Sequence, residues 1–185
     1  MTALYVLLGL AAAVAMWLVA IYNQLVRNRQ MVAEGWSGID VQLKRRHDLI
    51  PNLIETVKGY MGHERGVLEK VTELRAQSLK ATGVGDQARV EGALGAALGH
   101  LLAVAENYPD LKASQNFIQL QQSLAEIEDQ IQLARRYYNG AARNLNIVVA
   151  SFPSNLVAQN FGFTPVEYFE IEDAGERAVP KVSFP

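Results

Sequence analysis

The first twenty-six residues contain no charged side chain, and residues 3–22 are almost wholly apolar. About twenty helical residues at 1.5 Å each span the roughly 30 Å hydrocarbon core of a bilayer. The rest of the chain is far more polar, so residues 1–26 predict one membrane anchor helix. Tyr5 and Tyr22 would lie about 26 Å apart on that helix, close to the separation of the two aromatic-rich membrane interfaces.

A cleaved signal peptide is the alternative interpretation of this segment. It would need a basic start, an apolar stretch of about 7–15 residues and a small-residue cleavage site. The chain starts Met1-Thr2-Ala3, and Ala13-Val14-Ala15 lies inside the apolar run instead of after it, so we expect an uncleaved anchor. Arg27 and Arg29 follow the run and no basic residue precedes it. The positive-inside rule therefore predicts a single-pass protein with most of its chain in the cytoplasm.

Composition excludes several classes of function. With 17 basic and 19 acidic residues the net charge is -2, so there is no basic excess to neutralise the phosphates of a nucleic acid. The absence of cysteine excludes a disulfide framework, a thiolate nucleophile and a thiolate metal ligand.

An apolar stripe at alternating steps of four and three residues follows the anchor and predicts a long, coiled-coil-like amphipathic helix to Lys80. The stripe keeps its phase through Pro51, which favours a kink there over a loop. Arg46 lies in the stripe and is a candidate for a buried, paired charge. The positions of the stripe are Val32, Trp36, Ile39, Leu43, Arg46, Ile50, Leu53, Val57, Tyr60, Glu64, Val67, Val71, Leu74 and Ser78.

Two further stripes predict helices over residues 86–107 and 114–152. Asp86 is a plausible N-cap of the first. That helix also carries a face of small residues, and because each interior glycine costs about 1 kcal/mol relative to alanine, we expect a closely approaching neighbour to compensate. The small residues are Gly92, Gly95, Ala96, Gly99 and Ala103. The Asn139-Gly140 pair is a common turn sequence. The third stripe runs through it without a break, so we expect the helix to continue there.

These elements predict an all-α chain with three parts. Residues 1–26 form the transmembrane helix. Residues 27–163 form an antiparallel bundle of three long helices, the first kinked at Pro51, plus a short fourth helix that Ser154 begins. Residues 164–185 form an extended C-terminal tail.

Helix lengths raise a question of coverage. A helix over residues 29–80 would be about 78 Å long, against about 33 Å and 58 Å for the two that follow. Trp36, Ile39 and Leu43 would then stay in water. Either the chain folds back near Pro51 or other copies cover the stripe, and the second alternative predicts a homo-oligomer.

No catalytic or metal-binding motif is found. None of His47, His63 and His100 has a glutamate three residues before it, as a di-metal helical bundle would require. The basic run of residues 44–48 could contact anionic lipid only if the chain folded back, and pairing with Glu126, Glu128 or Asp129 is the expected alternative. We therefore expect no cofactor and no enzymatic activity.

Several motifs resemble the LemA family. They extend over nearly the whole chain in order: Tyr22-Asn23-Gln24-Leu25-Val26, Leu49-Ile50-Pro51-Asn52-Leu53, Glu106-Asn107-Tyr108-Pro109-Asp110, Ala134-Arg135-Arg136-Tyr137-Tyr138-Asn139 and Ala178-Val179-Pro180-Lys181-Val182. The resemblance implies a bacterial protein with one N-terminal membrane helix and a helical-bundle domain, here placed at the inner membrane. It implies no catalytic residues.

Two functions remain open at this point. The first is a non-enzymatic, membrane-anchored scaffold or adaptor that binds the bilayer, further copies of itself, or another membrane or cytoplasmic protein. The second is a membrane-tethered ligand-binding or hydrolytic accessory protein with a polar pocket near Arg46, His47 and Asp48. The candidate interaction residues are Trp36, Ile39, Leu43, Arg46, Tyr108 and Tyr138.

Overall fold

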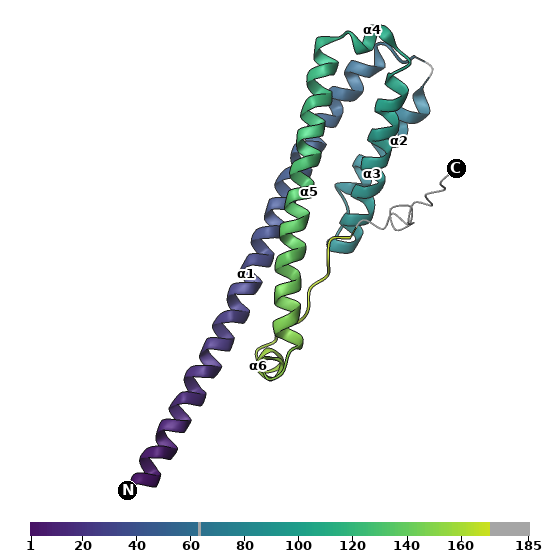
Figure 1. Cartoon of the computed structure of the whole chain (residues 1–185). Helices are drawn as coiled ribbons and strands as arrows, with labels where there is room; N and C mark the ends of the chain where they lie inside the picture. The colour runs from purple at the N-terminus through teal and green to yellow at the C-terminus, as the bar shows by residue number, and fades with distance from the viewer. Residues whose placement is uncertain (63, 171–185) are drawn as a thin grey trace, which may run out of the picture. The chain divides into compact units, whose positions relative to one another are not determined.

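The computed structural model describes residues 1–62 and 64–170, and all regular structure in them is helical, so the all-α prediction is confirmed (Figure 1). The helices are α1 (Thr2–Lys58), α2 (Arg65–Ser78), α3 (Val84–Ala105), α4 (Pro109–Lys112), α5 (Gln115–Ala150) and α6 (Ser154–Asn160). The chain divides into two compact units. Unit 1 comprises residues 1–41 and 131–168, and unit 2 comprises residues 42–130 with the segment from Phe169 onward. The predicted domain boundaries after residues 26 and 163 stay a prediction.

The first long helix ends earlier than predicted. α1 continues through Pro51, stops at Lys58, and is followed by α2 from Arg65, so a fold-back at Pro51 and one helix to Lys80 are both wrong. Pro51 has no N–H to donate to the carbonyl of His47 one turn earlier, and Nε of Arg75 in α2 donates to that carbonyl instead, at 2.8 Å. The reversal instead falls where Gly59 and Gly62 weaken the helix within four residues. A bend of α1 at Pro51 stays a prediction.

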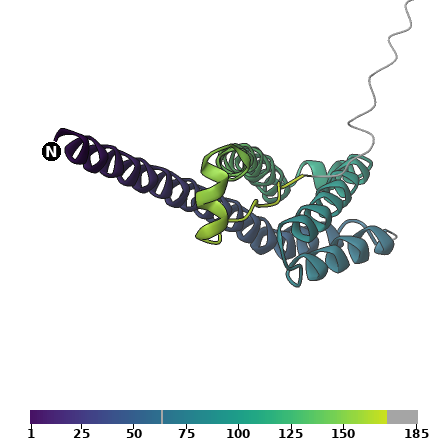
Figure 2. The ribbon, with the colours of Figure 1, turned by 90° about the horizontal axis from the view of Figure 1, so that it is seen from below.

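In unit 1, α1 and the second half of α5 lie side by side (Figures 1 and 2). Residues 2–20 of α1 are exposed, and burial begins at Ile21. The ring of Trp36 contacts that of Tyr138 edge-on, with centroids 5.7 Å apart. Gly35 lies so close to Tyr138 that an added Cβ would come within 2.9 Å of its Cα. The close approach of two helices thus occurs at a glycine of α1.

Unit 2 has its own apolar core, and α2 packs against α3 in it. The core draws on the end of α1, the following turn, α2, α3, α4 and the start of α5. Its members are Ile50, Leu53, Val57, Met61, Leu68, Val71, Leu74, Leu94, Leu98, Leu101, Ala105, Leu111, Phe117 and Leu124.

The predicted close neighbour for the small-residue face of α3 is wrong. Ala96, Gly99 and Ala103 are exposed, and a Cβ at Gly99 would meet no atom of residues 1–62 or 64–170 within 4 Å. The small side chains instead leave a groove of about 410 Å³, with Gly95 and Gly99 on one side and Gln121 and Ala125 of α5 on the other.

The expected uncovered stripe is wrong as well. Ile39 and Leu43 are at most 3% exposed within a single chain, and Trp36 is partly buried. Because α1 ends at Lys58, its buried part from Ile21 is about 57 Å long, and α5 with its 36 residues is about 54 Å long. The length mismatch that motivated a homo-oligomer therefore does not exist. Self-association itself stays a prediction.

The start of α3 differs from the prediction, and glycines lie at two of the helix ends. α3 begins at Val84 after Gly83, which has a φ of 85°, so Asp86 is not the N-cap but a first-turn residue favoured by the helix dipole. α5 runs through Gly140 as predicted. Gly162 follows α6 with a φ of 70°, which favours glycine at a helix end.

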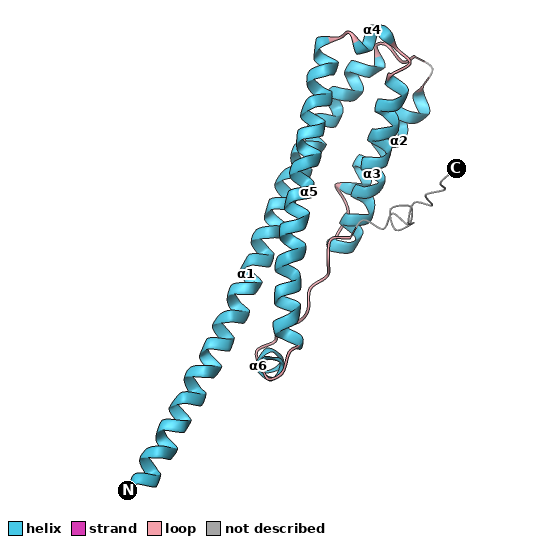
Figure 3. Ribbon diagram, viewed as in Figure 1, coloured by secondary structure: helices cyan, strands magenta, loops and turns pink. Residues whose placement is uncertain are grey.

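The segment after α6 has no helix in residues 163–170, as predicted for the start of the tail (Figure 3). In unit 1 it is held on α5 by Asn146, whose amide donates to the carbonyl of Val166 at 2.9 Å and accepts from its N–H at 2.8 Å. The hydroxyl of Tyr138 donates to the carbonyl of Glu167 at 2.8 Å. The remainder of the predicted tail, residues 171–185, lies outside the described residues.

Candidate functional site

A buried polar cluster in unit 2 is centred on Glu91 of α3. Arg46 and His47 reach it from α1, and Ser78 reaches it from the end of α2. All four side chains are almost completely buried, with exposures of 2% for Arg46, Ser78 and Glu91 and 6% for His47. Three helices thus bring their buried charged and polar groups to one point.

The carboxylate of Glu91 is surrounded by donors. It forms an ion pair with Arg46 and accepts a hydrogen bond from the hydroxyl of Ser78. Its Oε1 also lies 2.7 Å from Nε2 of His47 and 3.1 Å from the amide nitrogen of Gln87. Since both oxygens have partners within the protein, the carboxylate is held as a structural anion.

Electrostatics fix the charge on Glu91. Burial alone would raise the pKa of this carboxyl, because desolvation penalises the charged form. The hydrogen bond with His47, the positive charge of Arg46 and the Ser78 hydroxyl outweigh burial and lower the pKa to about 2. Glu91 is therefore ionised throughout the physiological range.

The guanidinium of Arg46 joins two acids. Its Nη1 donates to Glu128 of α5 at 2.8 Å, while Nη2 donates to Glu91 and to the backbone carbonyl of that residue. The side chain of Glu128 is 43% exposed, so one acid is buried and the other faces water. The prediction that Arg46 is a buried, paired charge is confirmed, with Glu128 among the expected partners.

The structure separates the residues of the predicted polar pocket. Arg46 and His47 turn inward to Glu91, whereas Asp48 is exposed. Arg75 donates from Nε to the carbonyl of His47 at 2.8 Å, which holds the backbone there. The same network leaves Arg46 Nε buried without a hydrogen-bond partner among the described residues.

The other candidate interaction residues are mostly core. Ile39, Leu43 and Tyr138 are buried, Trp36 is partly buried, and Tyr108 is partly buried against the core of unit 2. Sequence reasoning missed Glu91, Ser78 and Gln87. One signal was available, since Arg46 and Ser78 are both polar positions in the first apolar stripe and both belong to the cluster.

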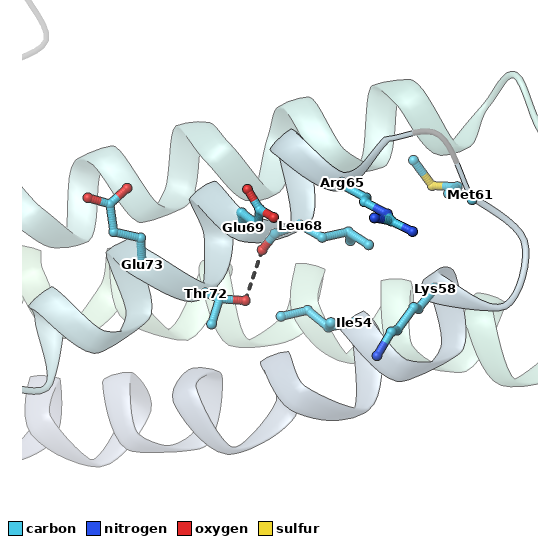
Figure 4. Close-up of a pocket in the computed structure, with 9 residues that line it drawn as sticks. Ile54, Lys58, Met61, Arg65, Leu68, Glu69, Thr72 and Glu73 are labelled. Carbon is cyan, nitrogen blue, oxygen red and sulfur yellow. Dashed lines mark hydrogen bonds between the residues drawn. The ribbon is translucent and has the colours of Figure 1, made fainter.

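An open groove of about 730 Å³ lies between the end of α1 and α2 in unit 2 (Figure 4). Ile54 and Leu68 point into it from the two helices, and Met61 lies in the turn at one end (Figure 4). Lys58 and Arg65 give that end positive charge, and Thr72 lies on the α2 side. The groove therefore combines an apolar floor and a basic end with two carboxylates of α2, those of Glu69 and Glu73.

Comparison with known proteins gives one family and several relatives. The sequence profile of the LemA family matches residues 35–184. Magnetosome protein MamQ 2 of Paramagnetospirillum magneticum is 27% identical over 184 aligned residues, covering 85% of this chain and 68% of the relative. Magnetosome protein MamQ of Magnetospirillum gryphiswaldense is 25% identical over the same shares. Protein LemA of Metamycoplasma hominis is 29% identical over 153 residues, covering 82% of this chain and 69% of the relative.

Proposed function

Because the chain belongs to the LemA family, we propose that it is a non-enzymatic adaptor of the bacterial inner membrane, anchored by one helix. The observation that carries the proposal is α1 itself. Its residues 2–20 are exposed and almost wholly apolar, and the same helix continues without a break into the buried core from Ile21. α1 is long and apolar enough to cross a bilayer.

The orientation follows from charge. Arg27 and Arg29 stand just past the apolar segment, and basic residues next to a span are retained on the cytoplasmic side. The helical part of the chain after the anchor then lies in the cytoplasm. α3 also has the length and apolar character of a span, but it is a core helix of unit 2 and carries the buried Glu91.

The cytoplasmic helices form an antiparallel bundle in this proposal. Short connections support it, because the chain has only six residues between α1 and α2, and five between α2 and α3, and short loops join antiparallel neighbours. The buried Arg46–Glu91 pair fixes which faces of α1 and α3 meet, a role in specificity that buried ion pairs fill in some proteins.

The α1–α2 groove is the proposed partner site. Thr72 and Glu73 are exposed along it, and the apolar floor of Ile54, Met61 and Leu68 can accept one face of a partner's amphipathic helix. An acidic side chain on that helix would face Lys58 and Arg65. Self-association is not part of this proposal, since its motivating stripe is buried.

Two experiments test the proposal. For the anchor, Leu10→Arg with Val14→Arg should release the full-length protein from membranes into the alkaline wash, whereas Leu133→Arg with Ile147→Arg, on exposed positions of α5, should not. Release of neither variant, or of both, contradicts anchoring by residues 1–20.

For the groove, a photo-crosslinking residue at Thr72 in intact membranes should give a discrete adduct with another protein. The same residue at Gln77, which is also exposed on α2, is the control position. No adduct from Thr72, or the same adduct from Gln77, would refute the adaptor groove.

A further inference from the structure

Three large apolar side chains around α6 are exposed to an unusual extent. Phe152 is 81% exposed, Leu156 is 52% exposed and Phe161 is 62% exposed. We call these three residues the α6 patch. Clustered exposed apolar residues of this size mark an interaction surface more often than single ones do.

The α6 patch lies beside the point where α1 leaves the rest of unit 1. The rings of Tyr22 and Phe161 meet edge-on with centroids 4.9 Å apart. Tyr22 directly follows Ile21, the first buried residue of α1, and the twenty residues before it are exposed. Figures 1 and 2 both show α6 next to α1 at this end of unit 1.

The α6 patch is held in place by buried neighbours. Val157 and Ala158 of α6 are 5% and 0% exposed. The hydroxyl of Ser154 donates to the carbonyl of Val148 at 2.6 Å. Since the opposite face of α6 is packed, the exposed side chains cannot turn inward without unfolding the helix.

Two arginines of α1 lie near the same end of unit 1. The guanidinium of Arg29 lies 5.0 Å from the centre of the Phe163 ring, and that ring is 5.9 Å from the ring of Tyr22. Arg27 is exposed on the same helix. Aromatic side chains together with arginines are typical of segments that lie at the headgroup level of a membrane.

We infer that the α6 patch inserts into the interfacial region of the bilayer in which α1 is anchored. The inference rests on the proposed anchor and adds a second contact, one that fixes how unit 1 stands on the membrane. Its occupant is lipid, because Phe161 of the patch contacts Tyr22, which lies at the end of the exposed apolar segment of α1. Docking of a second copy is an alternative outcome of the test.

The absence of cysteine permits a direct experiment on the full-length chain. Three variants each carry a single cysteine, in place of Leu156 in the α6 patch, Leu133 on α5 or Leu10 in the anchor. Leu156 and Leu133 are matched in exposure, at 52% and 51%. Each cysteine carries a nitroxide, and the protein is reconstituted into vesicles of phosphatidylcholine and phosphatidylglycerol. Collision with oxygen, which concentrates in lipid, is compared with collision with a water-soluble nickel chelate.

The expected result is a several-fold higher ratio of oxygen to nickel collisions at position 156 than at position 133, and a higher ratio still at position 10. A lipid-like ratio at position 10 with equal ratios at 156 and 133 overturns the α6 contact and leaves the anchor standing. A water-like ratio at position 10 overturns the anchor, and position 156 then decides the α6 contact by itself. Low collision with both reagents at 156, with dipolar broadening between labels, would assign the patch to a second copy and overturn the inference.

Discussion

A Cβ atom on Gly35 would lie 2.9 Å from the Cα of Tyr138 and 3.1 Å from the ring of Tyr137. The backbones of α1 and α5 therefore meet at a distance that only glycine permits. The edge-on contact of Trp36 with Tyr138 is immediately next to this point. Residues 34–37 of α1 are thus where the pairing of the two helices in unit 1 is set.

Gly35→Ala should destabilise the protein. Overpacking against backbone costs about 1–3 kcal/mol, which exceeds the gain of up to about 1 kcal/mol from replacing glycine in a helix. Gly38→Ala is the matched control, since a Cβ there meets nothing within 4 Å, and it should be neutral or stabilising. Urea unfolding of both variants in detergent measures the difference, and equal effects would contradict the close approach.

The two acids on Arg46 should differ strongly in their contribution to stability. Glu91→Gln leaves a buried guanidinium without its buried counter-charge, and breaking such a pair costs about 3–5 kcal/mol. Glu128→Gln removes an acid that is 43% exposed and should cost less than about 1 kcal/mol. Thermal unfolding of the two variants is the measurement. If Glu128→Gln lowered the stability as much as Glu91→Gln does, Glu91 would not be the main counter-charge of Arg46.

Much of the helical fold could be predicted from local pattern. The apolar positions Ile39, Leu53 and Val71 of the first stripe are all buried, although they belong to two helices. The stripe could not reveal the break between α1 and α2 because its phase survives the turn. Pro51 is the stronger sequence signal, yet α1 continues through it, because Arg75 donates to the His47 carbonyl that the proline leaves without its helical donor. The helix ends instead next to Gly59 and Gly62.

The buried cluster was only half predictable. Arg46 stands out because a charge in an apolar stripe needs a partner. Glu91 does not stand out, since it directly follows Val90 in α3 and its partners Arg46 and Ser78 lie 45 and 13 residues away in sequence. That pairing depends on how α1, α2 and α3 meet, which periodicity within one helix does not determine.

Acid should weaken the protein through Glu91. The pKa of about 2 in the folded protein is below the ordinary glutamate value of 4.5, so the unfolded state binds a proton first as the pH falls. The stabilisation is complete above about pH 5 and is lost between about pH 5 and 2, with a total of about 3 kcal/mol. Free energies of unfolding measured across this window should fall less steeply for Glu91→Gln than for the unmodified chain. Parallel pH profiles would show that other carboxyl groups cause the acid sensitivity.

Asn146 should control whether the segment after α6 stays on α5. Its amide makes both hydrogen bonds of the Val166 backbone, at 2.8 and 2.9 Å. The side chain thus pairs with this extended segment as the backbone of an adjacent strand would. Asn146→Ala removes both bonds and leaves the Val166 N–H to exchange with water. Hydrogen exchange of residues 164–168 should therefore accelerate by at least about tenfold, as the loss of about 1.4 kcal/mol would produce.

Asn144→Ala is the matched control for this change, because Asn144 is an exposed asparagine on the same helix and should leave the exchange rates unaltered. Tyr138→Phe removes the remaining hydroxyl bond to the Glu167 carbonyl and should speed exchange in the same segment by a smaller factor, since the ring keeps its contact with Trp36. If Asn146→Ala left the Val166 amide as protected as before, the apolar contacts of the segment, and not the amide pair, would hold it on α5.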